Sequence, residues 1–246
     1  MSRIKAYQGS ERGLVRNENE DSLLLHIPED PWALKGKGIL AAVADGVGGG
    51  PAGKYASSLA VDVVREAYYN LTFLSPEEGL SRSFQFANQT IRNESSNTRE
   101  YSGMSTTCTA FVCIGHKGFF CHIGDCRAYL FRDRVLHQLT KDHSLVNELI
   151  EGGIISQEEG RFHPQRNIIL KVLGSSGDIS PDIGTIELVN SDTILLCSDG
   201  LHGYASDEEI ASVLGEFSVD EAGKGLIELS LSKGGYDNVS VIIIRI

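Results

Sequence analysis

Five aspartates of this chain stand at the ends of expected β-strands, where their carboxylates could gather around a divalent cation. They are Asp21, Asp45, Asp125, Asp199 and Asp237. Asp45 and Asp199 each follow an apolar run and precede a glycine, which lets the backbone approach a bound ion closely. A turn-forming aspartate is the simpler interpretation of any one of them. Five together, three of them beside glycine, favour a shared cage of oxygen ligands.

Carboxylates in such a cage would repel one another, and without cations some of them would have to take up protons. Oxygen ligands without histidine or cysteine indicate Mg²⁺ or Mn²⁺ rather than zinc. Two such ions, typically about 3.5–4 Å apart, can lower the pKa of a bridging water and orient it for in-line attack on a phosphoester. Arg16, five residues before Asp21, is placed to bind the phosphate with its guanidinium, and a solvated surface arginine is the alternative.

Apolar periodicity predicts the elements that would position these residues. Residues 53–71 and 76–97 carry apolar side chains at helical spacing, and residues 145–150 form a shorter expected helix. Serine–glutamate capping boxes predict further helix starts at Ser156, Ser206 and Ser218. Apolar or alternating runs predict strands at 4–8, 22–27, 39–44, 108–114, 119–123, 127–131, 135–139, 193–198 and 239–246.

The order of these elements predicts an α+β protein with helices packed over antiparallel sheets. The strands within residues 108–139 follow one another closely, so a single antiparallel meander is expected there, with Asp125 in one of its turns. Residues 28–38 are expected to form a loop, and residues 152–177 are mostly irregular. No internal repeat or linker divides the chain, so one domain over residues 1–246 is preferred to two small ones.

Composition limits the class of function. The net charge of −11, from 22 basic and 33 acidic residues, argues against a protein that binds nucleic acid. No apolar run approaches the roughly 18 residues that span a bilayer, and residues 1–5 lack the apolar core of a signal peptide. Neither a membrane partner nor secretion is therefore expected, and the cytoplasm is the expected location. The five cysteines form no CxxC pair, so neither a disulfide framework nor a zinc site is indicated.

Seven segments, in order along nearly the whole chain, resemble the motifs of the PP2C (PPM-type) metal-dependent protein serine/threonine phosphatases, in their compact bacterial form. The segments are GLVRNENED at 13–21, ADGVGG at 44–49, GMSTT at 103–107, GDCR at 124–127, TKDHS at 140–144, SDGL at 198–201 and DNVS at 237–240. The resemblance implies a four-layer α/β/β/α sandwich of two antiparallel sheets flanked by helices. It also implies a flap subdomain at about residues 145–177.

The resemblance further implies a role for each matched residue. The implied metal ligands are Asp45, the Gly46 carbonyl, Asp125, Asp199 and Asp237, with Glu20 and Asp21 acting directly or through coordinated waters. Asp45 would bridge two core ions, and Asp125 would serve a more weakly held third ion. Arg16 would bind the substrate phosphate, and with Asp45 and Asp199 it makes up the implied catalytic set. Asn238 would orient Asp237 from behind.

Some positions depart from the family pattern. Many eukaryotic members carry a histidine, proposed to protonate the leaving alkoxide, where Val47 stands. The acid must then be a metal-bound water or another group. His143 and His163 are the nearest candidates by motif, with structural hydrogen bonding as the alternative role for each. Gly203 stands near the position of a further third-metal aspartate in some relatives, although Asp207 lies close in sequence.

The implied activity is metal-dependent hydrolysis of phosphoserine and phosphothreonine on proteins, through a water or hydroxide that bridges two Mn²⁺ or Mg²⁺ ions. The expected partners are phosphorylated proteins and a cognate cytoplasmic Ser/Thr kinase, and the expected oligomeric state is a monomer. One alternative is a partner-switching phosphatase with a single dedicated phosphoprotein substrate. Another is a pseudophosphatase signalling module, against which the presence of Asp21, Asp45, Asp199 and Asp237 argues.

Overall fold

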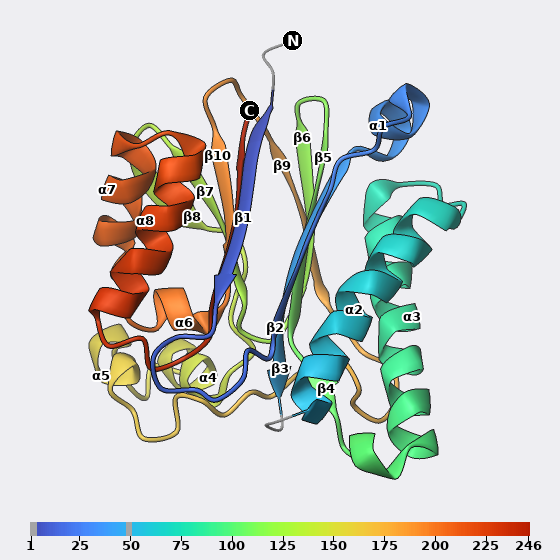
Figure 1. Cartoon of the computed structure of the whole chain (residues 1–246), viewed down its shortest axis with the longest axis horizontal. Helices are drawn as coiled ribbons and strands as arrows, with labels where there is room; N and C mark the ends of the chain where they lie inside the picture. The colour runs from blue at the N-terminus through green and yellow to red at the C-terminus, as the bar shows by residue number, and fades with distance from the viewer. Residues whose placement is uncertain (1–3, 48–50) are drawn as a thin grey trace.

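Two antiparallel β-sheets lie face to face, and a pair of helices covers the outer face of each (Figure 1). The computed structural model describes residues 4–47 and 51–246. The glycines at 48–50, part of the predicted glycine-rich turn, lie outside the described residues. The arrangement confirms the predicted four-layer α/β/β/α sandwich of the α+β class.

Each sheet is built from strands that are far apart in sequence. Sheet A has the strand order β1-β11-β10-β7-β8, and sheet B the order β2-β3-β5-β6-β9, with β4 paired to the end of β3. The strands of sheet A are β1 Lys5–Glu11, β7 Arg127–Arg132, β8 Val135–Gln138, β10 Thr193–Cys197 and β11 Val239–Arg245. Those of sheet B are β2 Asp21–His26, β3 Ile39–Val47, β4 Ser105–Thr106, β5 Cys108–Ile114, β6 Lys117–Ile123 and β9 Asp182–Glu187.

Four helices form the outer layers. The helices α2 (Pro51–Asn70) and α3 (Pro76–Asn97) pack on sheet B, and α7 (Asp207–Glu216) and α8 (Val219–Ser232) pack on sheet A. The shorter helices are α1 Pro31–Lys37, η1 Arg99–Tyr101, α4 Leu145–Glu151, α5 Gln157–Arg161 and α6 Asp199–His202. The capping boxes predicted at Ser156, Ser206 and Ser218 are all formed, because each serine accepts a hydrogen bond from a glutamate N–H three residues on.

Burial of β3 on both faces explains its unbroken apolar sequence. Leu40, Ala42 and Ala44 face the α2–α3 layer, whereas Ile39, Ala41 and Val43 face sheet A. Successive side chains of a strand point to opposite faces, so a strand between two packed layers needs apolar residues at every position. The sandwich therefore holds β3 firmly from both sides, up to the carboxylate of Asp45.

The predicted meander over residues 108–139 is wrong, because its four strands divide between the two sheets. The hairpin β5–β6 belongs to sheet B and the hairpin β7–β8 to sheet A. Residues 124–126 cross from one sheet to the other, with Gly124 at φ 109°. A Cβ on Gly124 would collide with the side chain of Thr107. Asp125 therefore stands on a crossover between the sheets and not on a hairpin turn.

Some elements of the described residues were not predicted, and they are α1, η1, β4, β9 and α6. Residues 28–38, expected to form a loop, contain α1, whose start is capped by Asp30 and followed by Pro31 at the first helical position. Helix α1 buries no side chain, so its sequence has no apolar periodicity from which a helix could be predicted. Strand β9 forms an edge of sheet B beside β6, and its residues alternate between half-buried and exposed.

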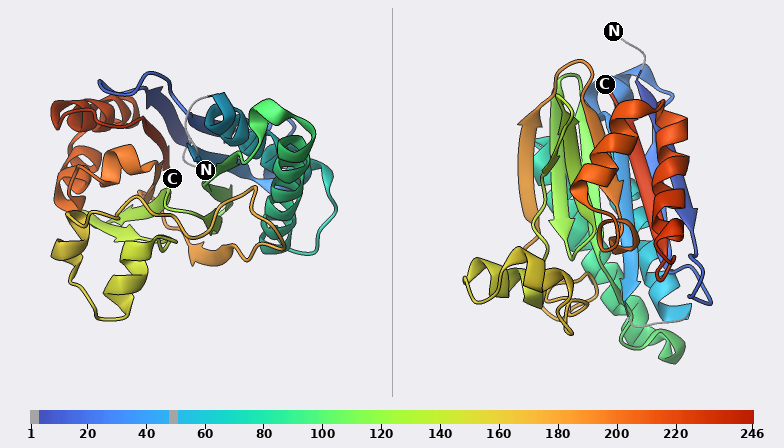
Figure 2. Two further views of the ribbon diagram at one scale, coloured as in Figure 1. Left: turned by 90° about the horizontal axis from the view of Figure 1, so that it is seen from below. Right: turned by 90° about the vertical axis from the view of Figure 1, so that its left-hand side faces the viewer.

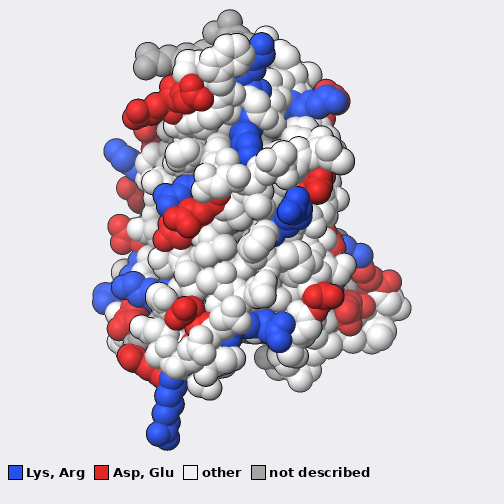
Figure 3. All heavy atoms as spheres, turned by 90° about the vertical axis from the view of Figure 1, so that its right-hand side faces the viewer, with Lys and Arg blue, Asp and Glu red and all other residues white. Residues whose placement is uncertain are grey.

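On the face over α2 and α3, basic and acidic side chains are interspersed (Figure 3). None of the helices in the described part of the chain combines the length and apolarity that crossing a membrane requires.

The packing of α3 on sheet B predicts unequal effects for two phenylalanines of the same helix. Phe84 is fully buried in the core, whereas 43% of Phe86 is exposed. We expect Phe84→Ala to lower the free energy of unfolding by about 3–5 kcal/mol, since it leaves a cavity. Phe86→Ala should lower it by less than about 1 kcal/mol. Urea unfolding monitored by circular dichroism measures both, and equal losses would contradict the packing.

Candidate metal centre

The five aspartates singled out in the sequence come together at one end of the sandwich, the lower end in Figure 1. Asp21 begins β2 and lies directly opposite Asp45 of β3 in the strand register. Asp199 follows β10, and Asp237 precedes the neighbouring strand β11. The negative charges of Asp21, Asp199, Asp125 and Asp237 all act on the carboxyl of Asp45. The structure therefore gathers the aspartates as predicted.

Burial and mutual repulsion raise the pKa values of four of these carboxyls. Burial raises the pKa of Asp21 to about 6, and that of Asp125 to about 7. Burial, followed by the negative charges of neighbouring aspartates, raises the pKa values of Asp45 and Asp199 well above their usual range. Within the described residues, Asp21 Oδ1 and Asp199 Oδ1 are buried without a hydrogen-bond partner. Such groups are costly unless a proton or a cation compensates them.

Glycines let the backbone close around this cluster. The N–H of Gly46 donates to the Glu20 carbonyl at 3.2 Å, which binds the end of β3 to the segment before β2. A Cβ on Gly46 would collide with the backbone of Gly53 in α2, and a Cβ on Gly53 would collide with the Glu20 carboxylate. The role of Gly53 was missed by sequence reasoning, because it depends on how α2 packs against the end of β3.

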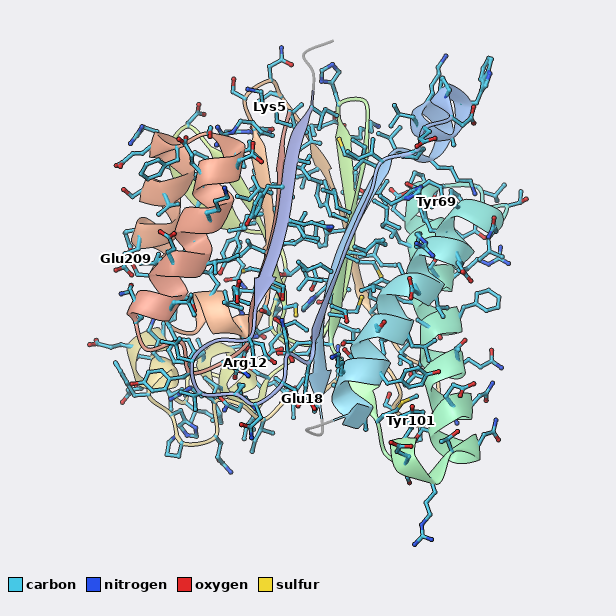
Figure 4. All side chains as sticks on the ribbon, viewed as in Figure 1. Lys5, Arg12, Glu18, Tyr69, Tyr101 and Glu209 are labelled. Atoms are coloured by element: carbon cyan, nitrogen blue, oxygen red, sulfur yellow. The ribbon has the colours of Figure 1, made fainter. Side chains whose placement is uncertain are left out.

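Asn238 fastens the loop that carries Arg16 and Glu20. Its Oδ1 accepts from the N–H of Glu20 at 2.9 Å, and its Nδ2 donates to the carbonyls of Arg12 and Glu18 at 2.8 and 2.9 Å. Its own N–H donates to Asp237 Oδ1 at 2.8 Å. Figure 4 shows Arg12 and Glu18 on this loop at the lower end of the sandwich. The buried side chain of Asn238 therefore organises the loop, while its backbone orients Asp237.

Arg16 stands inside the cluster. Its Nη2 donates to Asp237 Oδ2 at 2.7 Å, and 49% of its side chain remains exposed. Arg16 thus pairs with an aspartate of the cluster while part of its side chain stays in solvent, and its role in binding phosphate stays a prediction. The guanidinium supplies one positive charge beside the aspartates, with exposed surface left to meet an anion from solvent.

A cavity of about 570 Å³ adjoins the cluster and is lined by residues of α4, α5 and α6. The helices α4 and α5 project from this end of the sandwich (Figure 2). Asp125, Asp199 and Asp237 line one side, and residues of the expected flap, 145–177, line the other. Gly203 and Asp207, discussed above for a third ion, also line it. This cavity is where a molecule can approach the carboxylates.

An ion pair on the cavity wall had not been predicted. Arg127 Nε and Nη2 donate to the two oxygens of Asp142 at 2.8 and 2.7 Å, and Nη1 donates to Tyr129 Oη at 2.9 Å. Burial acts to raise the pKa of Asp142, but the hydrogen bonds and charge of Arg127 hold it below its usual value. Both residues lie in recognised motifs, GDCR and TKDHS, so the motifs were the available signal. This pair joins the start of β7, directly after the crossover, to the segment that follows β8.

His143 makes hydrogen bonds to the crossover beside Asp125. Its N–H donates to the Gly124 carbonyl at 2.7 Å, and its Nδ1 accepts from the Gly124 N–H at 3.1 Å. Burial lowers the pKa of His143. In the flap, His163 Nδ1 accepts from the N–H of Gln165 at 3.2 Å. Each histidine thus has the structural hydrogen bonds that were the alternative to a role as the acid.

The donor set fits a hard divalent cation. It consists of oxygens alone, and two buried carboxylate oxygens of the described residues lack partners. However, no three Asp, Glu, His or Cys side chains in residues 4–47 and 51–246 already stand at the spacing of a metal-ligand set. Carboxylates that repel one another stay apart, and Arg16 engages Asp237. A cation bound here has to draw these side chains together.

A four-layer sandwich with buried carboxylates at one end of its sheets is the architecture expected of metal-dependent protein phosphatases. A family model described as "Protein phosphatase 2C" matches residues 17–226, and the chain belongs to this family. The chain is 35% identical over 241 residues to the serine/threonine phosphatase stp of Listeria monocytogenes serotype 4b (strain F2365). The match covers 96% of this chain and 93% of the relative.

Solved structures agree with this assignment. The serine/threonine phosphatase Stp1 from Staphylococcus aureus superposes with a TM-score of 0.91 at 32% identity, covering 100% of this chain and 96% of that one. The catalytic domain of the phosphatase PstP, solved in complex with two manganese ions, has a TM-score of 0.86 at 34% identity. It covers 98% of this chain and 97% of that one. The chain is therefore a serine/threonine protein phosphatase of the PP2C type.

The ion pair on the cavity wall predicts a large loss for Asp142→Asn, because the substitution leaves the Arg127 guanidinium without its counter-charge. We expect the free energy of unfolding to fall by at least about 2 kcal/mol, less than for a fully buried pair since 22% of the Arg127 side chain is exposed. Urea unfolding measures the loss. The exposed pair Lys141–Glu151 provides the control, and Glu151→Gln should cost less than about 1 kcal/mol. Equal losses would contradict the role of the wall pair.

The raised pKa values of Asp21 and Asp125 predict how stability depends on pH in EDTA. Their folded pKa values, about 6 and about 7, lie above the usual 3.8, so the folded state binds more protons than the unfolded state between about pH 4 and pH 7. Their stabilising contribution is full below pH 4 and is lost as the pH rises through 7. These two carboxyls should lower the melting temperature from pH 5 to pH 7.5. His122 and His202, whose pKa values burial lowers to about 4 and about 3, act in the opposite sense, so the effect of a carboxyl is measured as the difference between wild type and a variant.

Asp125→Asn should flatten that decline and raise the melting temperature at pH 7.5, since one buried carboxyl no longer has to ionise. Asp62→Asn, on the exposed side of α2, is the matched control and should leave the pH profile unchanged. An identical profile for wild type and Asp125→Asn would mean that the cluster does not set the pH dependence.

Proposed function

We propose that the enzyme hydrolyses phosphoserine and phosphothreonine in proteins with a water that two divalent cations activate. The observation that carries this proposal is the cluster of five aspartates with Arg16 beside it. Burial raises the pKa values of four of them, which are Asp21, Asp45, Asp125 and Asp199. Bound Mn²⁺ or Mg²⁺ would supply Lewis acidity that lowers the pKa of a water and screens the charge of the phosphate. The manganese complex of the related PstP supports the choice of cation.

We assign the ligands from the cluster. Asp45, the Gly46 carbonyl, Asp199 and Asp237 would hold the two core ions, and Asp125 would serve a weaker third. Glu20 and Asp21 would complete the set directly or through waters. The register of β2 against β3 supports this assignment, because it fixes Asp21 opposite Asp45. The contacts of Asn238 support the same assignment, because its hydrogen bonds hold the loop that carries Glu20 in place.

Arg16 would bind the substrate phosphate in this scheme. Its side chain is 49% exposed while Nη2 is hydrogen-bonded to Asp237, so an incoming anion could reach it without a rearrangement of the loop. Val47 has no proton to donate to the leaving alkoxide, and the Nδ1 atoms of His143 and His163 already accept hydrogen bonds. We infer that water in the cavity protonates the leaving group. The flap, residues 145–177, would bear on substrate choice, since it lines that cavity.

We further infer that the enzyme acts as a monomer in the cytoplasm and reverses the action of a Ser/Thr kinase. One chain supplies every residue of the candidate site, which supports a monomer. All five cysteines are free and buried, which fits a reducing compartment. The activity of the relatives, which are named serine/threonine phosphatases, supports a kinase as the opposing enzyme.

Substitution of the proposed ligands tests the cation chemistry. We expect Asp45→Asn and Asp199→Asn to lower kcat/KM for p-nitrophenyl phosphate in Mn²⁺ by at least about 100-fold, since each removes a charged ligand. Calorimetric titration should show weaker Mn²⁺ binding in both variants. Asp62→Asn is the control of matched charge and should retain full activity. Wild-type activity that survives excess EDTA would overturn the proposal.

A further inference from the structure

Three large apolar side chains are exposed next to the candidate site, and we call them the apolar rim. Leu14, Val15 and Tyr236 have exposed fractions of 69%, 60% and 55%. Leu14 and Val15 directly precede Arg16, and Tyr236 directly precedes Asp237. The rim thus comes from two segments that the Arg16–Asp237 ion pair joins at 2.7 Å. Exposed apolar groups gathered beside polar ones mark interaction sites more often than isolated ones do.

Backbone contacts hold the two segments of the rim in place. The N–H of Leu14 donates to the Gly235 carbonyl at 2.7 Å. Gly13 has φ 78°, and a Cβ there would collide with the carbonyl oxygen of Asp237, so the segments pack backbone on backbone. The side chain of Asn238 fastens the same loop through two carbonyls. An apolar surface that is already ordered loses little conformational entropy when it binds a partner.

The rim is also continuous with the cavity that holds the carboxylates. The ring of Tyr236 lies against the ring of Tyr204, with centroids 5.6 Å apart. Tyr204 lines the cavity together with Asp199 and Asp237. Tyr236 therefore connects the rim to the wall of the cavity.

We propose that the apolar rim binds an apolar side chain of the substrate protein, one or two residues from the phosphorylated residue. This inference rests on the proposed binding of phosphate by Arg16. An extended chain advances roughly 3.3 Å per residue. When the phosphate lies at Arg16, substrate residues one or two positions away are therefore within reach of Val15 and Leu14. The rim selects substrates by sequence without touching the reacting atoms.

The test uses two phosphothreonine peptides that differ only in carrying Leu or Ser at the two positions on each side of the phosphoresidue. p-Nitrophenyl phosphate, which is too small to reach the rim, reports the chemistry itself. The wild-type enzyme should favour the Leu peptide by about 10-fold in kcat/KM, the size of discrimination that apolar subsites achieve. The double variant Leu14→Ser/Val15→Ser should lose this preference through a higher KM, with kcat unchanged.

Two controls separate the rim from general effects. Trp32→Ser removes a side chain that is 79% exposed on α1, at the opposite end of the sandwich, and should leave both peptides unaffected (Figure 1). Leu14 packs on Gly235, so the single variant Val15→Ser tests the rim if the double variant unfolds at a lower urea concentration. In Val15→Ser the preference for the Leu peptide should fall from about 10-fold to about 3-fold or less.

Several outcomes would overturn the proposal. One is equal use of the two peptides by the wild-type enzyme. Another is a loss in the rim variants that is as large for p-nitrophenyl phosphate as for the Leu peptide, since this would place the rim in the chemistry. A third is a change of oligomeric state in the rim variants on analytical ultracentrifugation, since the occupant would then be a second copy of the chain. Failure of the proposed function is seen separately, as EDTA-resistant hydrolysis of p-nitrophenyl phosphate.

Discussion

The repulsion among buried carboxylates is the constraint on which the rest of the structure depends. Asp21 and Asp45 face one another because the β2–β3 register puts them there, and both strands are held by packing. The strands cannot move apart to relieve the charge without unpairing. Relief comes instead from local groups: Ser198 donates to Asp21 at 2.7 Å, and Arg16 donates to Asp237. The scaffold thus supplies the stability that keeps the aspartates together.

Hydrogen bonds at the crossover between the sheets also connect the carboxylate cluster to the expected flap, residues 145–177. His143 holds Gly124 through two hydrogen bonds, and its carbonyl accepts from the N–H of Leu170 at 2.7 Å. Arg127 and Asp142 brace the same two segments with a bidentate pair. A carboxylate at position 125 is therefore placed by a network that also ends in the flap.

What could be predicted from the sequence is what depends on local pattern. The strand at 39–44 and the capping boxes were found because burial periodicity and side-chain caps lie within a few residues of one another. The crossover at Gly124 was missed, because alternation is the same whichever sheet a strand joins. The pairs Arg16–Asp237 and Arg127–Asp142 depend on tertiary contacts. The motifs predicted which residues form the candidate site. Only the fold shows which residues of opposite charge form ion pairs there.

The excess of negative charge in the carboxylate cluster explains why protons and cations would compete for the same oxygens. The cluster brings five carboxylates together, and Arg16 supplies a single positive charge among them. At acid pH the deficit is met by protons, which is the origin of the raised pKa values. At neutral pH protons are scarce, and divalent cations bound as proposed would meet the same deficit while also bringing Lewis acidity. In that scheme, relief of the repulsion among the carboxylates would favour binding of the cations.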